Sequence, residues 1–150
     1  MASQSTLDTL IDLARDRKTE SAQEFARAVA RAQQSKQRLQ LLQNYRGEYE
    51  TRMRSQAGVG IGGAQIANYN RFIAQLTDAY EQQLLEVTQC DAMVEQARLA
   101  FLAEERKLKS FEILADRAEQ RQVASDAKRT QKQFDEFAAR AAFAGATSRF

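Results

Sequence analysis

The chain has 150 residues, with 22 Lys and Arg against 20 Asp and Glu, and it contains neither proline nor histidine. Because proline interrupts helix interiors, its absence favours long, continuous helices. Histidine is the commonest general base and metal ligand near neutral pH, so we expect no enzyme, no metal site and no cofactor; the net charge of +2 does not indicate nucleic acid either.

The N-terminal sequence, MASQSTLDTLIDLARDR, lacks the basic start and the apolar stretch of a secretory signal. No segment approaches the run of about 18 apolar residues that a membrane-spanning helix needs. The single cysteine, Cys90, cannot form an intramolecular disulfide. We therefore expect a cytoplasmic protein.

A first helix is predicted over about residues 6–54, with Ser5 or Thr6 as its N-terminal cap. Two interleaved sets of mostly apolar or small residues recur at seven-residue spacing, which is typical of a coiled-coil seam. The sets are Ile11, Lys18, Phe25, Ala32, Leu39, Arg46 and Met53, and Leu7, Ala14, Ser21, Ala28, Ser35, Leu42 and Tyr49.

Four of the six glycines, Gly58, Gly60, Gly62 and Gly63, follow this helix and predict a chain reversal over residues 55–64. Gly58, Gly60 and Gly63 also match G-x-G-x-x-G. That motif binds dinucleotides only after a β-strand, and here a heptad helix precedes it, so the glycines indicate a turn.

A second helix is predicted over about residues 65–142, with a more regular heptad pattern. Its two sets are Ile66, Ile73, Tyr80, Val87, Val94, Phe101, Leu108 and Ala115, and Tyr69, Leu76, Gln83, Cys90, Ala97, Glu104, Phe111 and Ala118. The expected fold is therefore all-α: one domain, residues 1–150, forming a long two-helix antiparallel coiled-coil hairpin.

Two registers fit the turn, in which the numbers of facing residues sum to 115 or to 122. The second register sets large residues against small ones, such as Leu108 against Ala14. It also sets Lys18 against Glu104, and we therefore predict it. Residues 116 onward then extend past helix one as a C-terminal overhang. Three aromatic side chains near its end indicate either a docking site or a frayed tail: Phe134, Phe137 and Phe143.

One flank of the hairpin near the turn carries aromatic residues, and the opposite flank is polar. Tyr45 and Phe72 fall on the aromatic flank, and neighbouring seam positions complete two helical stripes. We call this set the tip surface and predict that it binds a partner. Its residues are Arg38, Leu42, Tyr45, Tyr49, Phe72, Leu76, Ala79 and Gln83.

Three segments resemble the FliJ family, a soluble component of the bacterial flagellar type III export apparatus. They are LLQNYRGEY (41–49), NYNRFIAQL (68–76) and FDEFAARAA (134–142). Heptad packing does not demand the NY-x-x-FI and DEFA-x-RAA patterns, so these are the more specific part of the resemblance.

The resemblance implies a non-enzymatic coupling component similar to the central stalk of rotary ATPases. It implies that the terminal end enters the hexameric export ATPase, that the tip surface contacts the cytoplasmic domain of the export gate protein, and that export chaperones are also bound. It further implies a cytoplasmic protein that is peripheral to the inner membrane at the flagellar base, through the gate.

Two other functions remain open on the sequence. A coiled-coil scaffold could self-associate through Tyr45 and Phe72 without any ATPase. The basic face of helix one could bind an anionic surface, and a steep salt dependence would mark that activity. This face holds Arg27, Arg31, Lys36 and Arg38.

Overall fold

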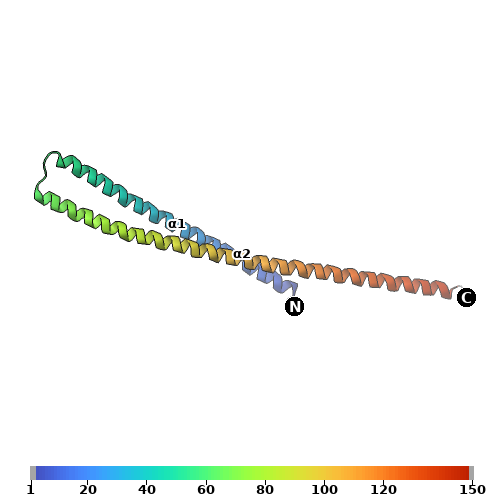
Figure 1. The fold of residues 1–150 in the computed structure, drawn as a ribbon. Helices are drawn as coiled ribbons and strands as arrows, with labels where there is room; N and C mark the ends of the chain where they lie inside the picture. The colour runs from blue at the N-terminus through green and yellow to red at the C-terminus, as the bar shows by residue number, and fades with distance from the viewer. Residues whose placement is uncertain (1–2, 149–150) are drawn as a thin grey trace. The chain divides into compact units, whose positions relative to one another are not determined.

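The computed structural model describes residues 3–148, which form two helices and a short turn (Figure 1). Helix α1 spans Gln4–Ala57 (54 residues), and helix α2 spans Gly63–Thr147 (85 residues). The described residues contain no strand, and the two helices pack against each other. The predicted all-α hairpin is confirmed, although both helices extend further at each end than the sequence suggested.

The cap of α1 differs from the prediction, because Ser3 occupies the position that Ser5 or Thr6 was expected to take. The Ser3 hydroxyl oxygen accepts a hydrogen bond from the backbone N–H of Thr6 at 3.2 Å, and the Ser3 carbonyl accepts one from Leu7 at 3.0 Å. These two bonds define an N-cap. Ser and Thr are both good N-cap residues, so residue type alone does not identify which of Ser3, Ser5 and Thr6 caps the helix.

Contacts divide the chain into two compact units. The hairpin unit runs from Lys18 to Glu104 and contains the turn, whereas the terminal unit combines residues up to Arg17 with those from Glu105 onward. In the terminal unit the core consists of Ile11, Ala14 and Leu108, against which Phe111 and Ala115 pack.

The predicted seam is confirmed along both helices. Every heptad position named from the sequence is buried or half-buried, with two exceptions near the turn, Arg46 and Ile66. Arg46 instead points along its own helix, where its Nε lies 3.3 Å from the Glu50 carboxylate. Ile66 is 47% exposed. Ile66 lines an open hollow beside the turn, which explains its exposure.

Contacts between the helices agree with the 122 register. The ion pairs Lys36–Asp91 (3.3 Å) and Arg15–Glu112 (4.0 Å) both join residues whose numbers sum to 127. At a rise of 1.5 Å per residue, the 115 register would separate each pair by about 18 Å along the axis, against about 7.5 Å in the 122 register. The shorter separation is within the reach of Lys and Arg side chains, so the 115 register is excluded.

The two charged seam residues, Lys18 and Glu104, do not form the contact that their placement suggested. Oε2 of Glu104 is buried and has no hydrogen-bond partner. The ammonium group of lysine is strongly hydrated and its stem is flexible, so it can turn from the seam toward water and leave this oxygen without a partner. This layer is therefore a weak point in the hairpin unit.

The turn over residues 58–62 requires glycine at one position. Gly60 has a φ of +98°, and no other described residue has a positive φ. We expect Gly60→Ala to lower the free energy of unfolding by about 1–2 kcal/mol, since L residues are strained at this φ. Urea denaturation followed by circular dichroism measures this change.

Gly62→Ala is the matched control for this substitution. An added Cβ at Gly62 meets nothing within 4 Å, as at Gly60, but Gly62 has no positive φ. Its effect on stability should stay within about 0.5 kcal/mol. Equal losses in the two variants would show that the turn does not depend on the backbone conformation of Gly60.

Candidate partner-binding surface

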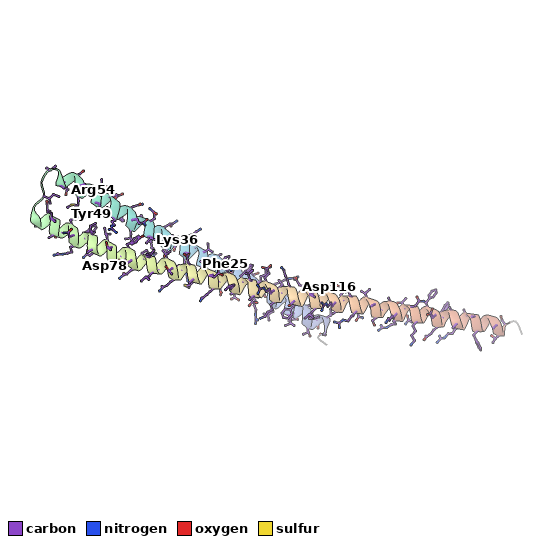
Figure 2. All side chains as sticks on the ribbon, viewed as in Figure 1. Phe25, Lys36, Tyr49, Arg54, Asp78 and Asp116 are labelled. Atoms are coloured by element: carbon purple, nitrogen blue, oxygen red, sulfur yellow. The ribbon has the colours of Figure 1, made fainter. Side chains whose placement is uncertain are left out.

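Tyr49 is the centre of an aromatic cluster between α1 and α2 in the hairpin unit (Figure 2). Its ring stacks on Tyr69 with a centroid distance of 5.4 Å and an interplanar angle of 8°. Phe72 packs against the same ring at 4.3 Å with a tilt of 48°. Offset-stacked and tilted pairs of this kind stabilise beyond the area they bury. The cluster therefore gives the tip surface a fixed base.

The tip surface divides into residues that face solvent and residues that also form the seam. Tyr45 is 60% exposed, Phe72 is 39% exposed, and Arg38 is exposed. The remaining members are half-buried, namely Leu42, Tyr49, Leu76, Ala79 and Gln83. Only Tyr45 and Phe72 thus offer large exposed rings, while the seam members hold the helices that carry them.

The Gln83 side chain forms hydrogen bonds between the two helices that were not predicted from the sequence. Its side-chain Nε2 donates hydrogen bonds to the backbone carbonyl and to the hydroxyl of Ser35, each at 3.0 Å. Ser35 is only 3% exposed. Buried polar groups need such partners, so the Gln83 amide is already engaged inside the hairpin. Its side chain is therefore less able to bind a partner than Tyr45.

A second apolar feature, which was not predicted from the sequence, lies beside the turn. An open hollow of about 630 Å³ lies next to the aromatic cluster. It is lined by Glu50, Met53, Arg54, Ala57, Ile61, Ile66 and Tyr69. Val59, in the turn itself, is 88% exposed. The signal was present in the sequence, because Val59 and Ile61 are apolar residues set among turn glycines, where polar residues are usual.

The overhang of α2 is exposed throughout. Ala118 is the last half-buried residue, and every described residue from 119 to 148 is exposed. Phe134, Phe137 and Phe143 are 69%, 72% and 73% exposed. These three side chains do not share one face of the helix. At about 100° per residue, Phe134 and Phe137 lie about 60° apart, whereas Phe143 lies on the side opposite Phe134.

One exposed ion pair in the hairpin unit has shifted pKa values. Arg98 donates hydrogen bonds of 2.9 and 2.6 Å to the Glu95 carboxylate, which lower the pKa of Glu95 and raise the pKa of Arg98. Both groups are on the solvent face of α2, where such pairs contribute little stability. Between residues 3 and 148, His, Cys, Asp and Glu form no group of three that could hold a metal. None of the described helices is apolar enough over a sufficient length to cross a bilayer.

Comparison with known proteins agrees with this architecture. The family model for the flagellar FliJ protein matches residues 3–147. The chain is 32% identical over 142 residues to the flagellar FliJ protein of Salmonella typhi, covering 95% of this chain and 97% of that protein. It is 29% identical over the same length to the flagellar FliJ protein of Escherichia coli strain K12, with the same coverage. A match along nearly the whole length includes both helices, the turn and the overhang, and the chain belongs to the flagellar FliJ family.

Proposed function

We propose that this protein is a non-enzymatic coupling component of the flagellar type III export apparatus. It connects the hexameric export ATPase with the cytoplasmic domain of the export gate protein, and it binds export chaperones. Family membership supports the place in flagellar export. The observation that carries the coupling role is the fully exposed helix beyond Ala118, which has apolar rings but no partner helix in the described chain.

The overhang is the part that docks into the ATPase ring. Phe134 and Phe137 share one side of α2 and are mostly exposed, so a ring interior can bury them without disturbing the seam. Phe143 faces the other side and would contact a different subunit. A single hairpin inside a hexamer cannot contact all subunits equally, and unequal contact shifts the populations of their conformational states.

The tip surface contacts the export gate. Exposed aromatic rings on a preorganised base suit a binding site, because little side-chain entropy is lost on association. Tyr49, which stacks on Tyr69 and contacts Phe72, supplies that base. Through this contact the protein is peripheral to the inner membrane at the flagellar base and otherwise cytoplasmic.

The test is ATP hydrolysis by the cognate export ATPase, titrated with the intact protein and with a chain truncated after Ala118. The truncation removes only exposed residues, so the hairpin and its core remain. We expect the intact protein to stimulate hydrolysis and the truncated chain to lose at least about nine-tenths of that stimulation, as loss of the only docking element predicts.

A matched pair of variants locates the contact within the overhang. Phe137→Ala should reduce stimulation, whereas Val59→Ala, at an exposed apolar residue in the turn, should not. Full stimulation by the truncated chain would contradict docking through the overhang. No stimulation by the intact protein, with an ATPase shown to form rings, would contradict the coupling role itself.

A further inference from the structure

A second heptad stripe begins in the overhang after the seam has ended. The seam spacing would continue from Ala118 to Gln122 and Ser125, which are polar. On another side of α2, small and apolar residues recur at alternating spacings of four and three. They are Val123, Ala127, Thr130, Phe134, Phe137, Ala141 and Ala144. All are exposed, with Val123 at 62%, so the described chain provides no helix to cover them.

The spacing of this stripe specifies the kind of partner. Alternating steps of four and three keep one side of a helix facing another helix that packs alongside it. A binding site for a loop or a small molecule does not require a heptad repeat that continues over more than three helical turns. The occupant is therefore a helix that pairs with α2 over most of the overhang.

The stripe is complementary to itself when two copies run antiparallel. Facing residues whose numbers sum to 264 place Phe137 against Ala127, Phe134 against Thr130, and Val123 against Ala141. Each large side chain then meets a small one, as interdigitating layers require. A parallel pair would instead set Phe134 against Phe134 and Ala127 against Ala127, which crowds one layer and leaves the other empty.

Charges beside the stripe favour the same arrangement. Asp126 and Arg140 occupy equivalent flanking positions two heptads apart, and Gln133 lies midway between them. In the antiparallel pair, Asp126 of each copy lies beside Arg140 of the other, and the two Gln133 amides meet at the centre. Arg140 has no ion-pair partner within the described residues, so its guanidinium is available.

The length of the overhang also fits this pairing. The exposed part of α2, from 119 to Thr147, is centred on residue 133, and the 264 pairing is centred on residue 132. Two overhangs therefore overlap along their whole length. Thr147 of one copy reaches the level of Arg117 of the other, where the packing between α1 and α2 begins. The hairpin contacts of each copy stay intact.

We infer that the overhang pairs with the overhang of a second copy of this chain in an antiparallel two-helix coil. The coil buries Phe134 and Phe137 in both copies. If the overhang also docks into the ATPase, as proposed above, self-pairing competes with that contact. The dimer is then unable to bind the ATPase through the overhang. The pairing itself does not depend on the proposed function.

A charge-exchange experiment on the full chain tests the pairing. D126R carries Arg at both flanking positions, and R140D carries Asp at both. We expect intact protein to form dimers in sedimentation velocity between about 10 µM and 1 mM, a range typical of a short coil. Each variant alone should associate at least about tenfold more weakly, and an equimolar mixture should recover dimerisation, because only the mixed pair places Arg beside Asp at both ends.

Two further variants separate this stripe from other apolar surfaces. Phe137→Ala should raise the dimer dissociation constant at least about tenfold, since one large ring is lost from each copy. Phe143→Ala removes an equally exposed ring from outside the stripe and should change the dimer dissociation constant less than about twofold. All four substituted positions are exposed on α2, so helicity by circular dichroism should match the parent chain.

Three outcomes would overturn the inference. The intact chain could remain monomeric up to 1 mM, which would assign the stripe to a helix of a different protein. The mixture of D126R and R140D could associate no better than either variant, which would exclude the antiparallel arrangement. Phe143→Ala and Phe137→Ala could weaken association equally, which would place the contact outside the stripe.

Discussion

Leu108→Ala is expected to lower the free energy of unfolding by about 2–3 kcal/mol, which is a large fraction of the stability of a small domain. Leu108 is 7% exposed and packs in the terminal unit with Ile11 and Ala14. A two-helix structure has no second layer of side chains that could move into the space left by the missing atoms. The partly exposed edge of this core keeps the loss at the low end of the range for buried leucine.

Urea denaturation followed at 222 nm measures the change, with Leu114→Ala as the matched control on the same helix. Leu114 is 44% exposed and lies outside the core cluster, so its replacement should cost less than about 1 kcal/mol. Hydrogen exchange should locate the effect of Leu108→Ala in the first turns of α1, around Leu7 and Ile11. Similar losses in the two leucine variants would mean that the terminal core contributes little beyond average helix packing.

Tyr45→Ala is expected to weaken binding to the cytoplasmic domain of the export gate protein by about thirtyfold, or roughly 2 kcal/mol, as is usual for a central aromatic contact. Tyr45 is 60% exposed and makes no ring contact with Tyr49, Tyr69 or Phe72. Its loss should therefore leave the unfolding curve within about 0.5 kcal/mol of the parent. Titration calorimetry with the isolated gate domain measures the affinity.

Leu85→Ala is the control for this experiment, because Leu85 is also on the hairpin unit and is 66% exposed, but it is outside the tip surface. It should leave the affinity unchanged within about twofold. Tyr49→Ala provides the opposite comparison. Because Tyr49 stacks on Tyr69 and also packs against Phe72, its removal should reduce both affinity and stability. Gate binding that is equal for Tyr45→Ala and Leu85→Ala would contradict the assignment of the tip surface.

The architecture could be derived from the sequence because it depends on periodicity, which is a local property of each helix. Residues such as Ala32 and Leu108 fall at heptad positions whatever the partner is, and both are buried in the structure. The glycine cluster at residues 58–63 similarly ended one helix and began the next. Pairing large residues with small ones selected the 122 register, and the ion pair between Lys36 and Asp91 agrees with it.

Other features depended on contacts between the two helices, which no single-helix pattern contains. Ile66 and Arg46 occupy correct heptad positions, yet both are exposed, because Ile66 lines an open hollow beside the turn and Arg46 pairs with Glu50 along its own helix. The Gln83 side chain was assigned to a partner surface, and its two hydrogen bonds to Ser35 became visible only once α1 and α2 were packed.

The same distinction applies to the tip surface and the overhang. Sequence spacing placed Tyr45 and Phe72 on one flank, but only packing sets how much of each ring remains exposed. Three phenylalanines near the end of α2 indicated either a docking site or a frayed tail, and the unbroken helix places Phe143 on a different side from the other two. Heptad spacing specifies which side of a helix a residue occupies, whereas exposure and hydrogen bonding depend on the side chains of the facing helix.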